Sequence, residues 1–256
     1  MQSLVLTLVF GKTGMDQEVD HISPWLDPSF RDQSEISNRY ANQTHRRCIK
    51  THTPFDGISY SPKCTYIAVY RHPMDAHFSM RKHVENLKIK NDSINQHYPE
   101  DVGKSFDNFL HNEDTRYGTD FISVKSIVHH YQSVMQWSHL PNLHFFHYAD
   151  MSKDLPHEIA RLSEILGYQF SSDQINEFAN ANSFNTMKSN AARNANPGGS
   201  ATFKNEAEFF SSGTSNKWEK YLSAEDIDRY EKRVEDLLPA GEINWLAWGN
   251  TKTSVA

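Results

Sequence analysis

The apolar residues of this chain gather in short runs that alternate with helical patterns. The runs lie at Cys48-Ile49, Tyr66–Tyr70 and Leu143–Phe146. Segments with apolar residues at helical spacing flank these runs, and this alternation is typical of a parallel sheet with helices on both faces. We therefore predict an α/β fold with a parallel sheet flanked by helices. In such sheets the ligand crevice lies at the carboxyl ends of the strands, so the residues after each run are the first site candidates.

The clearest helical pattern begins near Asp154 and stops at Gly167. Pro156 suits its first turn, and glycine commonly follows the last turn of a helix. The apolar residues that share one face of this helix are Ile159, Leu162, Ile165 and Leu166. By similar patterns we expect a buried helix over Leu4–Phe10 and further helices over 73–88, 119–138, 172–181 and 223–237.

Two segments, 100–118 and 190–208, are rich in Asn, Asp, Gly and Ser. These residue types favour turns and irregular backbone. No internal repeat or low-complexity tract accompanies them. We therefore expect two loops, each able to cover a binding site.

The bulk properties favour one domain in a reducing compartment. A chain of 256 residues with 38% hydrophobic content can bury one large core, so we expect a single domain over 1–256. Its two cysteines, Cys48 and Cys64, match neither a disulfide framework nor a metal spacing, which favours the cytoplasm. The apolar segment Met1–Phe10 lacks a basic region and a cleavage site and is too short to span a membrane.

The charge of the chain implies that any anionic ligand is bound locally. A formal net charge of −6 gives no general attraction to nucleic acid or to a membrane surface, and we predict neither as a partner. A local cluster follows the run Tyr66–Tyr70, where Arg71 ends the strand and Pro73 suits the next helix. Backbone N–H groups, the Arg71 guanidinium and the Ser79 hydroxyl would suit a phosphate monoester. The alternative is a surface arginine and an ordinary helix serine.

Lys50 and His52 follow the run at Cys48-Ile49 and are predicted to point into the same crevice. A neutral imidazole can take the proton from an attacking hydroxyl, worth roughly 10²–10⁴-fold in rate, while an ammonium stabilises charge on transferred or leaving oxygens. The pair is typical of group transfer. The alternative is that His52 has no catalytic role, because any one of the fourteen histidines is more often simply packed or solvated. The Lys50 and His52 motif by itself leaves this alternative open.

Other histidines do not indicate a metal centre. His144 and His147 lie three positions apart on a predicted strand and would face opposite ways. The pair His129-His130 has no HExxH pattern or cysteine partner. We predict no metal.

Four segments in order, KTHTPFDG, YIAVYRHPMDAHFS, FFHYADM and NSFNTMK, resemble the soluble, cytosolic-type sulfotransferase family over nearly the whole chain. The resemblance implies a P-loop-type parallel sheet. It implies an enzyme that transfers a sulfuryl group from the co-substrate 3′-phosphoadenosine 5′-phosphosulfate (PAPS) to a hydroxyl of a small organic acceptor. It also implies that His52 is the general base, that Lys50 stabilises the charge, and that Arg71 and Ser79 hold the 3′-phosphate.

The same resemblance implies further nucleotide contacts. It places Tyr148 at the nucleotide and the segment from Asn182 to Met187 on the adenine, with Phe184 as the aromatic residue. The alternative for Tyr148, Phe184 and Met187 is plain core packing.

The chain departs from the family in a C-terminal loop of the type Phe-x-Arg-Lys-Gly, which closes over the 3′-phosphate. Ser211 and Ser212 stand where the two cations would be, although Gly213 and the later Trp218 match. Charge-assisted bonds are roughly twice as strong as neutral ones, so we expect weaker nucleotide binding unless Lys204 or Lys217 compensates. The family's dimer motif is only partly visible around Leu222–Asp228, which leaves a homodimer as one outcome.

The chain also departs from the family at its start. Family members begin with a strand and a Pro-Lys-Ser-Gly-Thr-Thr-Trp loop around the 5′-phosphosulfate, and this sequence contains neither. We therefore expect a single sulfotransferase domain that is truncated at its N-terminus, and a longer form as the better enzyme. Two other functions stay open: a degenerate member that binds nucleotide or a partner without turnover, and a P-loop nucleotide kinase, which predicts Mg²⁺ and a Walker A lysine.

Overall fold

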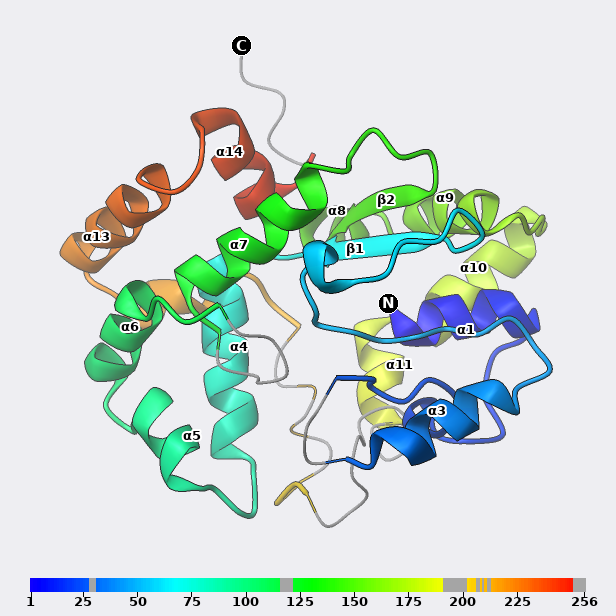
Figure 1. Cartoon of the computed structure of the whole chain (residues 1–256), viewed down its shortest axis with the longest axis horizontal. Helices are drawn as coiled ribbons and strands as arrows, with labels where there is room; N and C mark the ends of the chain where they lie inside the picture. Colours follow the sequence, from blue (N-terminus) through cyan, green and yellow to red (C-terminus); the bar gives the residue numbers. More distant parts are fainter. Residues whose placement is uncertain are drawn as a thin grey trace. The chain divides into compact units, whose positions relative to one another are not determined.

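The computed structural model describes residues 1–27, 31–115, 122–190, 202–205, 208, 210 and 213–250. It divides into two compact units, which we describe separately (Figure 1). Unit 1 comprises Met1–His52 and Asp154–Gly213, and unit 2 comprises Thr53–Lys153 and Thr214–Ala256.

Unit 2 contains a small parallel sheet and a larger set of helices (Figure 1). Its strands are β1 (Tyr66–Tyr70) and β2 (Leu143–His147). Its α-helices are α4 (Pro73–Glu85), α5 (Asp92–His97), α6 (Val102–His111), α7 (Val124–Met135), α8 (Tyr148–Lys153), α13 (Ala224–Glu235) and α14 (Ala240–Trp248). Two 3₁₀ turns, η1 (Phe55–Gly57) and η3 (Lys217–Lys220), complete it.

The two strands pair in parallel, with Tyr66 opposite Leu143 and Tyr70 opposite His147. Parallel neighbours require a long crossover, and α4 to α7 supply it. The predicted parallel sheet is confirmed for these two runs. Side chains from the two strands and from α4, α6 and α7 contribute to the core of unit 2, among them Met74, Phe106 and Tyr131.

Unit 1 consists of helices: α1 (Gln2–Phe10), α2 (Val19–Ile22), α3 (Gln33–Ala41), α9 (Leu155–Leu166), α10 (Ser172–Ala181) and α11 (Phe184–Ser189). Residues Leu4–Leu8 of α1 are buried, which confirms the helix predicted from the apolar opening segment. In Figure 1, α1 lies beside α10, and α9 packs against both helices.

The ends of the unit 1 helices follow local signals in the sequence. The Asp154 side chain accepts a hydrogen bond from the His157 N–H at the start of α9, and Gly167 closes the helix with a positive φ of 77°. Glycine adopts this conformation without a steric penalty. Ser171 and Gln174 form a capping box on α10, and α10 has the predicted bounds.

Two predictions of secondary structure are wrong. The run at Cys48-Ile49 forms no strand, because pairing with a neighbour is limited to an isolated bridge between Trp25 and the next residue, Lys50. Part of the predicted loop 100–118 is helix α6. Its apolar residues recur at helical spacing and are buried, and the Asp101 side chain caps the Lys104 N–H at 2.7 Å. The loop predicted over 190–208 lies largely outside the described residues.

Three other predicted helices form with shorter bounds. The pattern over 73–88 becomes α4, which ends at Glu85, and the pattern over 223–237 becomes α13. In place of 119–138 the chain forms α7, which begins after the Ser123 cap. Among the described residues, no helix has both the length and the apolar character needed to cross a lipid bilayer.

His77 of α4 is a buried histidine for which neither ring nitrogen has a hydrogen-bond partner in the described part of the chain. Its ring stacks on Phe109 with centroids 4.5 Å apart and meets Phe78 edge-on at 5.2 Å. Burial, with smaller contributions from the charges of Arg81 and His97, lowers the pKa of His77 to about 3. The folded chain therefore holds this imidazole neutral.

We expect His77 to make the fold sensitive to acid. The folded pKa lies below the unfolded value of about 6.5, so its contribution to stability is complete above pH 6.5 and is lost as the pH falls toward 3. Between pH 7 and pH 5 this loss is about 2 kcal/mol. In His77→Phe the loss of stability between pH 7 and pH 5, measured by urea unfolding, should be smaller than in the wild type by about 2 kcal/mol. The control His139→Gln, at an exposed position, should keep it, and an unchanged pH dependence in His77→Phe would contradict the assignment.

Candidate functional site

Lys50 and His52 of unit 1 both lie against the indole of Trp25. The Lys50 Nζ is 4.9 Å from the centroid of an indole ring, and the His52 ring centroid is 4.6 Å away at a tilt of 44°. Trp25 itself is buried and bridges to Lys50, whose carbonyl accepts the Leu26 N–H at 2.9 Å. The contacts of the Lys50 ammonium and the His52 ring with the buried indole restrict the positions of both side chains. The two predicted catalytic residues therefore share one rigid support.

Asp27 holds the backbone of this segment, a role that the sequence did not indicate. One carboxylate oxygen accepts the Thr51 hydroxyl at 2.7 Å. The other accepts the Trp25 Nε1–H at 2.9 Å and the backbone N–H of His52. The Asp27 carboxylate therefore links the Trp25 indole to two consecutive residues, Thr51 and His52. Hydrogen bonds to an ionised acceptor are among the stronger ones in proteins.

Arg71 and Tyr148 of unit 2 lie at one edge of the parallel sheet. Each directly follows a member of the register pair Tyr70 and His147, so the pairing brings them to the same end. The Arg71 guanidinium carbon is 4.3 Å from the centroid of the Tyr148 ring. This is the contact expected when a strand-end arginine and a strand-end tyrosine face one another.

The Arg71 guanidinium has further neighbours in unit 2. One terminal nitrogen donates to the Thr214 carbonyl at 3.1 Å and lies 3.8 Å from the Asp75 carboxylate. Its Nε is buried and has no partner among the residues that the structure describes. A buried donor without an acceptor is costly, which marks this arginine as a candidate for binding an anion.

Ser79 lies on α4 in line with two charged residues. Asp75, Ser79 and Lys82 are four and three positions apart, so they share one face of the helix. The Asp75 carboxylate is buried and accepts the backbone N–H groups of Asn216 at 3.0 Å and Lys217 at 3.1 Å. The segment around Lys217 is thereby attached to the face of α4 that carries Ser79.

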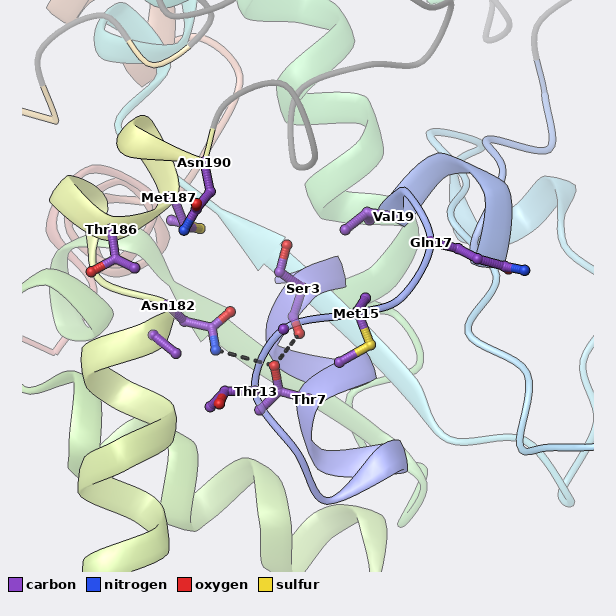
Figure 2. Close-up of a pocket in the computed structure, with 12 residues that line it drawn as sticks. Ser3, Thr7, Thr13, Met15, Gln17, Val19, Asn182, Thr186, Met187 and Asn190 are labelled. Atoms are coloured by element: carbon purple, nitrogen blue, oxygen red, sulfur yellow. Dashed lines mark hydrogen bonds between the residues drawn. The ribbon is translucent and has the colours of Figure 1, made fainter.

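Asn182 and Met187 line a pocket of about 260 Å³ within unit 1 (Figure 2). The other residues of its wall come from α1, the turn after α1, the start of α2, and the helix α11 with its C-cap, and include Ser3, Thr7, Thr13, Met15, Val19, Thr186 and Asn190. Buried Asn182 donates to the Thr7 hydroxyl at 3.2 Å and to the Phe178 carbonyl at 3.0 Å, and Thr7 donates to the Ser3 carbonyl at 2.8 Å. The lining is therefore polar and ordered around Asn182 and Thr7, and Met15 and Met187 add apolar side chains from two sides of the pocket (Figure 2).

Phe184 and Gly213 are also brought together in unit 1. Gly213 has a positive φ of 65°, and a Cβ at this position would lie 2.6 Å from the Phe184 ring. Only glycine fits there, so the backbone of the C-terminal segment can approach the ring closely. Ser211 and Ser212, which we predict at the same site, lie outside the described residues.

Two buried histidines have structural roles in unit 2. The Nδ1 of His147 accepts the Ala149 N–H at 3.1 Å, so its Nε2 donates to the Leu246 carbonyl, also at 3.1 Å. Burial lowers the pKa of His147. His72 caps α4 by accepting the Met74 N–H. Within the described residues, no group of three or more His, Cys, Asp or Glu side chains could hold a metal ion.

Comparison with known proteins matches the chain to a family model described as a sulfotransferase domain, over residues 9–241. A glycolipid sulfotransferase of Mycobacterium bovis is 29% identical, and the alignment covers 97% of this chain and 84% of that protein. Sulfotransferase 2A2 of Mus musculus is 24% identical, with coverages of 87% and 74%.

Solved structures show the same fold. A retinol dehydratase in complex with androsterone and the inactive cofactor PAP superposes with a TM-score of 0.71 at 20% identity, covering 100% of this chain and 78% of that one. A mouse sulfotransferase complexed with PAP gives a TM-score of 0.70 at 20% identity, with coverages of 93% and 81%. The α/β fold class is thus confirmed. Because the family model spans most of the chain, this protein belongs to the sulfotransferase domain family.

Proposed function

We propose that this protein is a PAPS-dependent sulfotransferase that sulfates a hydroxyl of a small organic acceptor, with His52 as the general base. The observation that carries the proposal is the placement of Lys50 and His52 on one indole, with Asp27 holding the intervening backbone. Relatives that are sulfotransferases support the reaction class. Structures with the related fold that hold androsterone or retinol support a small hydroxyl compound as the acceptor.

In the proposed reaction the donor supplies a sulfuryl group bonded to its 5′-phosphate. His52 removes the acceptor's hydroxyl proton as the acceptor oxygen bonds to sulfur, and the bond between sulfur and the phosphate oxygen breaks. The nucleotide leaves as 3′-phosphoadenosine 5′-phosphate (PAP). Lys50 stabilises negative charge on the transferred and leaving oxygens.

Arg71 and Ser79 would hold the 3′-phosphate in this proposal. The buried Nε of Arg71, which has no partner in the described part of the chain, fits such an anion. Tyr148 lies on the guanidinium and would keep it in place. Asn182, Phe184 and Met187 would contact the adenine, since the pocket beside Asn182 is lined by both polar and apolar side chains. Gly213, with Ser211 and Ser212, would complete the nucleotide site.

A cytoplasmic location and a single domain over all 256 residues also belong to this proposal. The two cysteines are both free, which suits a reducing compartment. The reaction needs no metal, because the transferred group is activated by its own phosphate bond and by the cations named above.

The first test is His52→Ala. A general base acts in the transition state, so sulfuryl transfer to a small phenol should fall roughly 10²–10⁴-fold while PAP affinity stays within about threefold. Transfer is measured with labelled PAPS and PAP binding by calorimetry. The control is His21→Ala, an exposed histidine of the same unit, which should change neither quantity. Equal losses of transfer and binding in His52→Ala would contradict the assignment.

The second test concerns Asp27. Asp27→Ala removes three hydrogen bonds from the Trp25 and His52 segment, and misplacing a catalytic group by about 1 Å costs roughly 10²-fold. We expect kcat to fall by about that factor with the donor KM little changed. Asp27→Asn keeps one acceptor oxygen and should restore part of the rate. Asp16→Ala, at an exposed carboxylate of unit 1, is the control. A rise in donor KM without a fall in kcat would refute the positioning role.

The third test compares two glycines with positive φ. Gly167→Ala should cost about 1 kcal/mol of stability, because alanine disfavours this conformation, and Gly213→Ala should cost more. Only Gly213→Ala would press a Cβ into the Phe184 ring, since nothing lies within 4 Å of a Cβ at Gly167. We therefore expect about tenfold weaker PAP binding in Gly213→Ala alone. The same PAP affinity in both variants would argue against Phe184 at the adenine.

A further inference from the structure

The segment that carries Lys50 and His52 depends on side chains for its position, because it lies outside the strands of the structure. Its pairing is limited to the bridge between Trp25 and Lys50, where the Leu26 N–H donates to the Lys50 carbonyl at 2.9 Å. A single bridge leaves neighbouring peptide groups without the partners that a strand would give them. The Cys48 carbonyl, two residues before Lys50, therefore needs donors from elsewhere in unit 1.

Two buried hydroxyl groups supply these donors. The Ser23 hydroxyl donates to the Cys48 carbonyl at 2.7 Å. The Tyr40 hydroxyl donates to the Pro24 carbonyl at 2.5 Å and lies 3.3 Å from the Cys48 carbonyl. Both side chains are buried, and a buried carbonyl that loses its donor is costly. The Tyr40 hydroxyl therefore joins two backbone segments, one on each side of the bridge.

Helix α3 determines the place of this hydroxyl. Tyr40 is the last residue but one of α3, and its ring is part of the buried core. Just after the helix, the Gln43 side chain donates to the Ile22 carbonyl at 2.7 Å, so the end of α3 binds the loop Ile22–Pro24 at two points. Burial raises the pKa of Tyr40. The phenol consequently stays protonated near neutral pH and keeps the proton that it donates.

The two segments that Tyr40 joins carry the candidate catalytic residues and their support. Trp25 directly follows the first of the two carbonyls, and its indole contacts the Lys50 ammonium and the His52 ring. The Asp27 carboxylate fixes the residues after the bridge, as described above. The Tyr40 hydroxyl fixes the residues before it. A shift of either segment would therefore move the indole relative to the lysine and the histidine.

We infer that the Tyr40 hydroxyl is a positioning group for sulfuryl transfer, because it holds the Trp25 and Lys50 segments together and so determines where the His52 imidazole lies. The inference rests on the proposed function. Tyr40 acts through these neighbours and needs no contact with the donor or the acceptor. Its ring packs in the core with or without the hydroxyl, so Tyr40→Phe removes the positioning oxygen alone.

The first measurement compares turnover with nucleotide binding in Tyr40→Phe. We expect kcat for transfer from PAPS to a small phenol to fall roughly 10- to 100-fold, because misplacing a catalytic group by about 1 Å costs roughly 10²-fold. PAP affinity and the number of PAP molecules bound per chain, both from calorimetry, should stay within about twofold, since uniform binding is not affected. The control Tyr168→Phe removes a hydroxyl from a half-buried tyrosine of the same unit and should change none of these quantities.

The second measurement follows the His52 ring itself by nuclear magnetic resonance of the full chain. The ring lies 4.6 Å from the Trp25 indole, so the ring current of the indole should displace the His52 Hε1 signal from its position in free histidine. The signal is identified by its loss in His52→Ala. In Tyr40→Phe it should move toward the free-histidine position, because the indole and the imidazole separate. In Tyr168→Phe it should stay at the wild-type position.

The two measurements separate a failure of this inference from a failure of the proposed function. An unchanged kcat or an unchanged His52 signal in Tyr40→Phe overturns the inference and leaves the proposed function standing. A kcat that falls only in proportion to the number of chains that bind PAP also overturns it, because a merely structural tyrosine would act in this way. A wild type that transfers no sulfuryl group overturns the proposed function, and the His52 signal then decides whether Tyr40 positions this ring.

Discussion

The parallel pairing of β1 with β2 is the constraint on which the arrangement of unit 2 depends. Parallel strands end at the same edge, so the register of Tyr70 with His147 brings the next residues, Arg71 and Tyr148, together. Helices α4 and α8 begin at this same edge of the sheet. A slip of one residue would turn each side chain to the opposite face of the sheet. The geometry around Arg71 is therefore a consequence of strand register.

In each unit a carboxylate holds a segment that carries a candidate site residue. Asp27 in unit 1 binds the indole and backbone that carry Lys50 and His52. Asp75 in unit 2 is buried on α4 and binds the turn that carries Lys217. In both cases an ionised acceptor satisfies backbone donors of a segment outside regular strands, which would otherwise be loosely placed. In each unit a side chain therefore holds in place a segment that regular secondary structure does not.

The histidines show why residue type alone is a weak guide to catalysis. His72 and His147 cap helices, and His77 fills an aromatic cluster, so all three are buried and structural. His52 differs because it is exposed and lies beside a lysine on a fixed indole. The exposed fraction of a histidine and the residues around it distinguish a structural histidine from a candidate base. The sequence alone gives neither of these two properties.

Local patterns in the sequence determined much of the fold. The bounds of α10, the caps of α9 and the two strands follow from spacing and capping within a few residues, and the order of motifs identified the family. Tertiary structure decided the rest. The run at Cys48-Ile49 forms no strand because a strand also needs a paired neighbour. Helix α6 was missed for another reason, because the polar composition of 100–118 outweighed two local signals, the helical spacing of its apolar residues and the Asp101 cap. The bond from Asp75 to the Asn216 N–H spans 141 positions. No local pattern records such a contact, because its energy depends on the path of the whole chain between the two residues.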